Sequence, residues 1–316
     1  MPANHVQMQP GLSMFEFLQR YGTEELCEAA VESARWPSGF VCPRCEGRSS
    51  WAFRRGAQPY RECIGCGYQC SLIAGTMFQN SKLPLTRWFM AMQLLSQAKN
   101  NVAALELRRQ LGVSYPTAWL LKHKIMEAMR QAEAQRQLHG RVELDDAYLG
   151  GERSGGTPGR GSENKIPFVL AVQTTGDGRP HQVCTARLPF RREAIAAFCD
   201  AHLLRPLTVV SDGLDCFAAA ARSGVHQRIV TGGGKASVQL PEFASVNILL
   251  GNLKTAITGT YHAFDFAKYA SRYLAEFQFR FNRRYRMRAM LPRILSAITH
   301  ATPCPTGLIR EPEDRC

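Results

Sequence analysis

Four cysteines are spaced so that their thiolates can meet around one metal ion. Cys42 and Cys45 form one Cys-x-x-Cys pair, and Cys63 and Cys66 form a second pair after 17 intervening residues. Two such pairs at this separation are typical of structural zinc sites, where four sulfur ligands complete a tetrahedron around Zn²⁺. The sequence therefore predicts a zinc ribbon whose metal stabilises the fold and takes no part in catalysis. Cys70 lies close enough in sequence to be an alternative ligand.

Two aspartates accompany segments that have the character of buried strands. Asp145 lies in the alternating segment 142–149, and Asp212 directly follows the apolar segment 207–211. Because catalytic groups gather at strand ends in α/β sheets, these carboxylates can share divalent cations. Mg²⁺ prefers hard oxygen ligands, and paired Mg²⁺ ions assist phosphodiester displacement. Asp146 is an alternative to Asp145, and alternation along the strand does not choose between the two.

The elements that must position these aspartates follow from hydrophobic periodicity. Three consecutive strands followed by alternating helices and strands predict an α/β fold with a mixed sheet. We expect strands at 142–149, 166–173, 181–188, 207–211 and 228–231, and helices at 191–203, 213–222, 242–257 and 264–285.

The region before these strands predicts helices with a DNA-binding arrangement. An amphipathic segment at 13–34 offers Phe15, Phe17, Leu18, Leu26, Ala29 and Ala30 for packing, and an apolar helix follows at 84–98. Two further helices are separated by Gly112, and Ser114 can cap the second one. The apolar face of that second helix is formed by Ala118, Leu121, Ile125 and Met129. The candidate DNA contacts are expected on the opposite face, at Tyr115, Thr117, Lys122 and His123. The pair resembles a helix-turn-helix, with an ordinary helical hairpin as the alternative.

The charge of the chain favours a polyanionic partner. The formal net charge is +13, and the excess of basic residues lies in segments 1–140 and 241–316, on either side of a nearly neutral middle. A surface that contacts phosphates is expected where arginines gather between aromatic residues, at Arg280, Arg283 and Arg284, with a solvated helix face as the alternative. In the glycine-rich loop 150–165, Arg153 and Arg160 can also meet phosphates, although a plain hairpin loop is slightly favoured there. Double-stranded DNA is therefore the expected partner.

Several classes of protein are excluded by missing features. The sequence has no run of 18 apolar residues, no signal-peptide pattern at its beginning and no nucleotide-binding P-loop motif. We therefore expect no membrane partner and a cytoplasmic, nucleoid-associated location.

Six motifs together resemble the DDE-type transposases of bacterial insertion sequences, in the branch that carries an N-terminal zinc ribbon. The resemblance covers about residues 14–290, and its carriers are 35–45, 75–78 with 83–85, 142–151, 211–213, 259–262 and 276–284. It implies an RNase H-like core similar to retroviral integrases. The motif assigns the metal-binding aspartates to Asp145 and Asp212. This branch has Asn where the common triad has Glu, here Asn247, followed seven residues later by a lysine, here Lys254, that contacts phosphate.

The resemblance implies an enzyme that binds terminal inverted repeats and catalyses metal-dependent strand cleavage and strand transfer with Mg²⁺ or Mn²⁺. Glu242 is an alternative source of a third carboxylate, and His262 is expected near the site or the DNA. A homo-oligomer assembled on DNA ends is expected. The alternatives are a nuclease without strand transfer and a non-catalytic DNA-binding protein, either a regulator or a decayed transposase. The predicted organisation is a helical segment (1–36), the zinc ribbon (37–72), the helix-turn-helix region (80–138), the core (139–290) and a tail (291–316).

Overall fold

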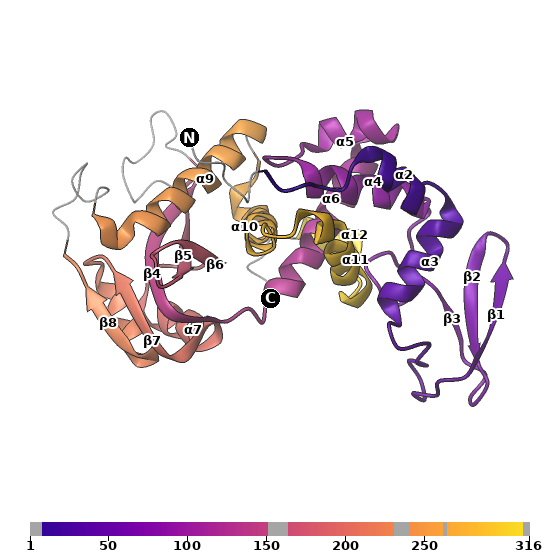
Figure 1. Ribbon diagram of the computed structural model, residues 1–316, viewed down its shortest axis with the longest axis horizontal. Helices are drawn as coiled ribbons and strands as arrows, with labels where there is room; N and C mark the ends of the chain where they lie inside the picture. Colours follow the sequence, from indigo (N-terminus) through magenta and orange to yellow (C-terminus); the bar gives the residue numbers. More distant parts are fainter. Residues whose placement is uncertain (1–7, 151–163, 231–239, 262–263, 312–316) are drawn as a thin grey trace. The chain divides into compact units, whose positions relative to one another are not determined.

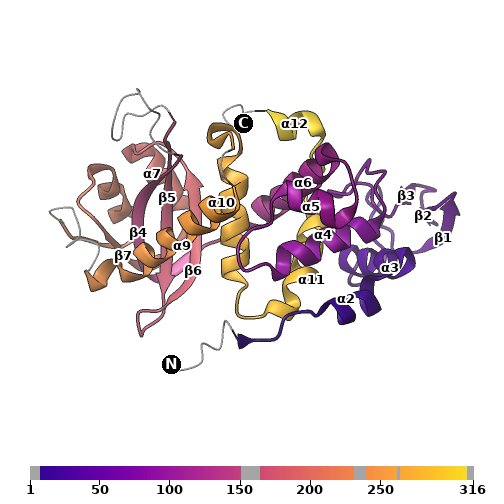
Figure 2. The same ribbon diagram turned by 90° about the horizontal axis from the view of Figure 1, so that it is seen from above.

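The computed structural model describes residues 8–150, 164–230, 240–261 and 264–311 (Figures 1 and 2). The chain forms two compact units, which are described separately. The N-terminal unit contains the chain up to Ala132 together with Arg283–Ile309, and the C-terminal unit contains Glu133–Asn282. Residues 283–309 thus fold with the N-terminal unit, a long-range association that no local sequence signal indicates.

The N-terminal unit begins with two short helices rather than one segment over 13–34. Helix α2 (Met14–Tyr21) starts at a capping box made by Ser13 and Glu16, and α3 (Glu24–Arg35) starts at Thr23. Each helix buries a narrow stripe, namely Phe17 in α2 and Cys27 with Val31 in α3. The prediction that Phe15, Leu18 and Leu26 pack inward is wrong, since these side chains are 82%, 49% and 40% exposed. A second helix axis changes which residues share the inner face.

The predicted ribbon is a three-stranded antiparallel sheet of order β1-β2-β3 (Ser50–Arg55, Gln58–Cys63, Gln69–Ser71). Phe53 and Tyr60 pair directly across β1 and β2, and their rings stack with centroids 5.5 Å apart. This cross-strand contact fixes the register of the hairpin that carries Cys63.

The predicted helical pair is present as α5 (Ala104–Leu111) and α6 (Tyr115–Glu133), after α4 (Leu85–Gln97). Gly112 ends α5 at φ 62°, a left-handed conformation that a residue without a Cβ adopts at least cost. The Ser114 hydroxyl accepts a hydrogen bond from the Thr117 N–H at 3.3 Å and so caps α6. The predicted inner face is confirmed, because Ala118, Leu121, Ile125 and Met129 are all buried. The unit is completed by η4 (Met287–Ala289), α11 (Met290–His300), which contacts α3 and α4, and α12 (Thr306–Arg310).

The C-terminal unit is a five-stranded mixed sheet of order β6-β5-β4-β7-β8. The first three strands along the chain, β4 (Leu138–Leu149), β5 (Ile166–Thr174) and β6 (Pro180–Arg187), are antiparallel neighbours. The last two, β7 (Leu203–Ser211) and β8 (Val225–Arg228), run parallel to β4. This order and these directions are those of the RNase H-like fold, so the predicted fold class is confirmed. The fifth strand begins three residues before its expected position.

Helices cover both faces of this sheet (Figures 1 and 2). One face packs against α7 (Arg192–His202) and the 3₁₀ segment η2 (Asp215–Ser223), through a core that includes Val142 and Leu144. The other face packs against α9 (Ala244–Thr260) and α10 (Phe266–Asn282), through a core that includes Ala147 and Leu149. The short η3 (Pro241–Phe243) leads into α9. Odd-numbered residues of β4 therefore face α9, and even-numbered residues face α7.

Helix α10 also covers the outer edge of β6. The Asn282 side chain accepts a hydrogen bond from the Val183 N–H at 2.8 Å and donates one to the Val183 carbonyl at 2.9 Å. One helical turn earlier, the Gln278 carbonyl oxygen accepts a hydrogen bond from the Thr185 N–H at 2.8 Å. Side chains of one helix thus take the place of a neighbouring strand. None of the helices in the described parts of the chain has the length and apolar character that crossing a membrane requires.

Candidate metal centres and nucleic-acid surfaces

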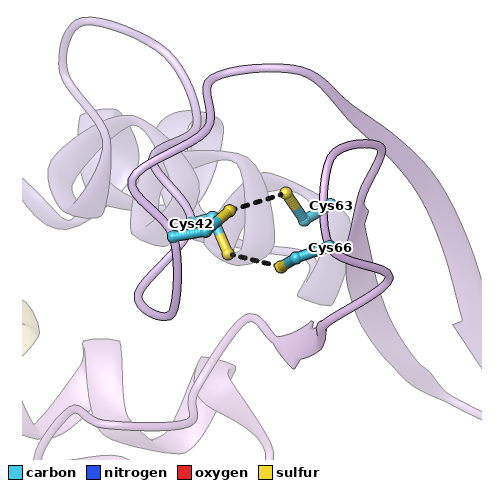
Figure 3. A group of neighbouring side chains, drawn as sticks. Cys42, Cys63 and Cys66 are labelled. Carbon is cyan, nitrogen blue, oxygen red and sulfur yellow. Dashed lines mark hydrogen bonds between the residues drawn. The ribbon is translucent and has the colours of Figure 1, made fainter.

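The four ribbon cysteines form one compact group. Their sulfur atoms all lie within 4.8 Å of one another, with Cys42 and Cys66 3.7 Å apart and Cys45 and Cys63 3.5 Å apart. Figure 3 shows Cys42 facing Cys63 and Cys66 from a separate loop. Tetrahedral zinc with sulfur at 2.3 Å places its ligands about 3.8 Å apart, so this group fits a structural Zn²⁺ site.

The surroundings of the Cys42 sulfur also suit a thiolate, whereas in the absence of metal the neighbouring Cys66 and Cys63 thiols raise the pKa of Cys45. Burial opposes ionisation, but hydrogen bonds from the backbone N–H groups of Arg44 and Cys45 lower the pKa of the Cys42 thiol to about 7. Cys70 does not belong to the group among the described residues. Its sulfur instead accepts a hydrogen bond from the Arg35 guanidinium at 3.4 Å, which gives the buried thiol a structural contact in place of a metal.

An acidic group lies where β7 ends beside β4, and its two β4 members lie within that strand and not at the end where the sequence placed Asp145. Carboxylate oxygens of Asp145, Asp146 and Asp212 all lie within 4.8 Å of one another. The parallel register pairs Leu144 with Ser211, so Asp145 and Asp212 are the next residues on their strands. Sequence reasoning expected this convergence of Asp145 and Asp212 from the strand order alone.

The two faces of the sheet distinguish Asp145 from Asp146. Asp145 follows the alternation of Ala147 and therefore faces α9, whereas Asp146 follows Leu144 and faces η2. The charge of Asp146 also reaches Cys216 of η2. Burial, and then this charge, raise the pKa of the Cys216 thiol to about 11. Asp212 follows Val210, which belongs to the α9 face.

The electrostatics of this group are unfavourable for negative charge. Burial, followed by the nearby charge of Asp146, raises the pKa of Asp145 to about 7. The charge of Asp212 acts in the same direction, and the N–H of Asp146, 2.9 Å from the carboxylate, acts against it. Lys254 also acts against it, so its positive charge is felt at the acidic group. A cation bound between these oxygens would relieve the same repulsion.

Helix α9 brings the other two predicted residues to this face. Its buried stripe, which includes Val246, Leu250 and Leu253, packs on the sheet. Asn247 and Lys254 are seven residues apart, close to two helical turns, and so lie along the same side of the helix. Asn247 is half-buried and Lys254 is exposed. Glu242 is exposed in η3, and its carboxylate is not part of the acidic group among the described residues.

A buried glutamate that the sequence reasoning gave no role connects β4 to α9. Glu143 is 1% exposed, and its Oε2 accepts a hydrogen bond from the Val246 N–H at 2.9 Å. Its Oε1 pairs with the Arg141 guanidinium at 2.7 Å, and the same guanidinium donates to the Glu242 carbonyl at 3.0 Å. The one available signal was a glutamate on the inner face of the strand, two residues before Asp145.

The predicted DNA contacts on α6 divide into two sets. Tyr115 is 49% exposed and Thr117 is half-buried, and both lie in the first turn. Lys122 and His123 are each 1% exposed, so the prediction that they lie on an exposed face is wrong. The Lys122 ammonium donates to the Val102 carbonyl at 2.7 Å, and the His123 ring lies 4.0 Å from that of Trp119. Beyond its first turns α6 is a core helix, which no local pattern revealed.

Of the remaining candidate DNA contacts, three lie outside the described residues and three are half-buried. Arg153, Arg160 and His262 lie outside the described residues. Arg280, Arg283 and Arg284 are half-buried, and burial lowers the pKa of Arg280 despite the nearby Glu276 charge. The arginine run does not form one helix face, because α10 ends at Asn282.

An RNase H-like sheet with paired aspartates on neighbouring strands, in a chain with a four-cysteine ribbon, is the plan of a zinc-ribbon transposase. The ISXO2-like transposase domain of the IS1595 group matches residues 137–282, and the transposase zinc-ribbon domain of the same group matches residues 22–69. Together these matches span more than half of the chain. The chain thus contains both a transposase domain and a transposase zinc ribbon of the IS1595 group.

Two further comparisons give individual relatives. The chain is 29% identical over 178 residues to the "Uncharacterized protein in transposable element ISH50" of Halobacterium salinarum, covering 51% of this chain and 58% of that relative. The match therefore spans less than two thirds of the relative's length. Among solved structures, the chain is similar to the "Mos1 transposase paired-end complex with left transposon end", with 11% sequence identity and a TM-score of 0.21. The match covers 62% of this chain and 76% of that chain. A likeness at that score has no bearing on the fold or the function.

Proposed function

We propose that this protein is a DNA transposase that binds the terminal inverted repeats of an insertion sequence and catalyses metal-dependent strand cleavage and strand transfer. Asp145, Asp212 and Asn247 would hold Mg²⁺ or Mn²⁺. The observation that carries the proposal is the convergence of the Asp145 and Asp212 carboxylates within 4.8 Å, on the face of the sheet covered by α9.

The donor set fits a hard divalent cation. Two carboxylates and an amide oxygen are ligands that Mg²⁺ accepts while keeping several waters. Burial, and then the charge of Asp146, raise the pKa of Asp145, and a bound cation would favour the ionised carboxylate there. When bound, Mg²⁺ would polarise a phosphodiester and promote ionisation of an attacking hydroxyl.

The residues around the acidic group have distinct roles in this proposal. Asn247 supplies an oxygen without a charge, so the loaded site stays more positive than one with a third carboxylate and attracts the DNA phosphate. Lys254, exposed on the same side of α9, would contact that phosphate. Asp146 faces η2 and would remain outside the ligand set.

DNA recognition would use the ribbon and the first turn of α6. Residues at the beginning of a recognition helix are those that reach base edges in helix-turn-helix complexes. Tyr115 and Thr117 occupy such positions, and Tyr115 is 49% exposed. Assembly of several copies on paired DNA ends belongs to the same proposal.

The test is cleavage of an oligonucleotide that carries one end of the element, in Mg²⁺, by the full chain. Asp145→Asn and Asp212→Asn should abolish cleavage and preserve binding to the repeat, and Asn247→Ala should impair cleavage. Asp146→Ala is the matched control, since it removes a neighbouring carboxylate from the other face and should have a milder effect. Greater loss with Asp146→Ala than with Asp145→Asn would move the site.

The products of the same reaction separate the alternatives. A transposase joins the cleaved end to target DNA, whereas a nuclease leaves it free. A regulator or decayed transposase would bind the repeat and cleave nothing, which would overturn the proposed activity.

A further inference from the structure

The N-terminal unit contains a cavity whose lining shares no residue with either metal centre. Its volume is about 530 Å³, and it is lined by loop 79–83, by one side of α6 and by residues 303–306. The residues from α6 are Thr117, Leu120, Leu121 and Lys124, which follow one another at helical spacing along a single stripe. The cavity therefore runs along α6 from its exposed beginning to its buried middle.

The lining is positively charged. It contains Lys82 and Lys124 and no aspartate, glutamate or histidine. Lys82 is exposed, whereas Lys124 is only 9% exposed. Two cations without an acidic residue beside them make the cavity complementary to an anion.

Lys124 is poorly satisfied by the protein. An ammonium group has three N–H donors, and that of Lys124 makes one long hydrogen bond, 3.4 Å, to the Met77 carbonyl. Among the described residues it has no carboxylate partner. Lys122, two residues earlier and more deeply buried at 1% exposed, donates to a carbonyl at 2.7 Å. Burying a charge without a partner is costly, so Lys124 is suited to a ligand that supplies the missing acceptors.

The rest of the lining indicates what this ligand is. Leu83, Leu120 and Leu121 supply an apolar wall, and Asn80 and Thr306 supply exposed polar groups. A volume of about 530 Å³ is within the usual range for small organic ligands and exceeds what a bare phosphate ion needs. An anionic group joined to a partly apolar group is a chemistry that nucleotides offer.

We propose that this cavity binds a nucleotide, with Lys124 and Lys82 as contacts for its phosphate. The nucleotide is part of a DNA strand, and this choice of source rests on the proposed function. The cavity begins beside the first turn of α6, where Tyr115 is exposed, so DNA that contacts this turn would have a nucleotide within reach of the cavity.

The test measures binding without added divalent metal and without chelator, so that the ribbon keeps its zinc and no cleavage occurs. Calorimetry measures the affinity of the protein for a deoxynucleoside monophosphate and for inorganic phosphate. Fluorescence anisotropy measures its affinity for a DNA oligonucleotide. Lys124→Met and Lys82→Met should each weaken binding of the monophosphate and the oligonucleotide at least tenfold. Lys99→Met, at an exposed lysine outside the lining, controls for the loss of one charge.

Each outcome decides the proposal. Equal affinities of wild type and both lining variants for every ligand would overturn it. An effect on the monophosphate alone would move the source from DNA to a free nucleotide, and an effect on inorganic phosphate alone would reduce the cavity to a simple anion site. If Lys124→Met does not fold, the exposed Lys82→Met carries the test. Failure of the proposed transposase activity would appear separately, as absence of Mg²⁺-dependent cleavage by wild type.

Discussion

Glu143 and Val246 are 103 residues apart in the chain and are joined by a hydrogen bond of 2.9 Å from the backbone N–H of Val246 to Oε2 of Glu143. Glu143 is two residues before Asp145 on the same face of β4, and Val246 directly precedes Asn247. One carboxylate thus ties the strand that carries a proposed metal ligand to the helix turn that carries another. A carboxylate near the first turn of a helix is also favoured by the helix dipole.

Replacement of Glu143 should weaken metal use more than DNA binding. Glu143→Ala removes the acceptor of the Val246 N–H and leaves Arg141 without its partner, so Asn247 loses its fixed position. We expect the Mg²⁺ concentration for half-maximal cleavage to rise about 10- to 100-fold, as for other residues that orient metal ligands. Glu143→Gln keeps a carbonyl oxygen for the Val246 N–H and should recover part of this loss.

A matched control for Glu143 is Glu242→Ala. Glu242 is an exposed acid of η3 whose backbone carbonyl, but not its carboxylate, bonds Arg141. Its loss should leave the Mg²⁺ dependence unchanged. Equal effects of Glu143→Gln and Glu143→Ala, accompanied by an equal loss of thermal stability, would reduce Glu143 to a packing residue.

Asp145→Asn should stabilise the metal-free protein while it abolishes cleavage. The folded pKa of Asp145, about 7, is above its value in the unfolded chain, so wild-type stability falls as the pH rises from about 4 to 7. The Asn variant keeps an acceptor for the Asp146 N–H and has no charge to ionise. Its melting temperature should therefore exceed that of wild type by about 4 °C above pH 7, and the two should converge near pH 4.

Calorimetry with and without Mg²⁺ checks this prediction. Mg²⁺ should raise the melting temperature of wild type and have little effect on Asp145→Asn, since a ligand stabilises only a protein that binds it. A variant that is less stable than wild type at pH 8 would show that the acidic group carries no repulsion.

Lys254→Gln should reduce the number of phosphates that the protein contacts. Loss of one contact lowers the slope of log affinity against log salt by about 0.9 and weakens binding to all DNA sequences alike. It should also slow cleavage, because Lys254 acts on Asp145. Lys268→Gln on α10 is the control for charge. An unchanged salt slope in Lys254→Gln would place the lysine away from DNA.

Removal of zinc should unfold the ribbon and leave the C-terminal unit folded. Alkylation followed by mass spectrometry should find the four ribbon cysteines protected in the zinc-loaded protein and modified after chelation. Cys199 and Cys216 provide an internal control, because burial raises the pKa of each thiol to about 11. Modification of ribbon cysteines before chelation would contradict a closed four-sulfur site.

The sequence predicted what local signals determine. Gly112 and Ser114 ended one helix and began the next because backbone conformation and capping depend on neighbouring residues. The strand order that brings Asp145 and Asp212 together followed from periodicity and from the general behaviour of α/β sheets. The ribbon followed from ligand spacing, which is itself a geometric requirement.

What the sequence missed depends on distant partners. A helical wheel places His123 outside and Lys122 at the border of the apolar face beside Met129, yet other parts of the chain bury both. Phe15 and Leu18 are apolar and exposed because α2 is short and only one stripe is covered. Alternation along β4 does not choose between Asp145 and Asp146; the family motif assigned Asp145, and which helix lies over which face is information that the strand itself does not contain.

The contacts of Gln278 and Asn282 with β6 have a consequence for how copies of this protein can associate. An outer strand normally offers free N–H and C=O groups to which a second chain can add a strand. Here two amide side chains already occupy those groups at Val183 and Thr185. At Val183 and Thr185 this border of the sheet therefore offers no free partners to an added strand. In the proposed assembly on DNA ends, copies would therefore meet through surfaces other than this part of β6.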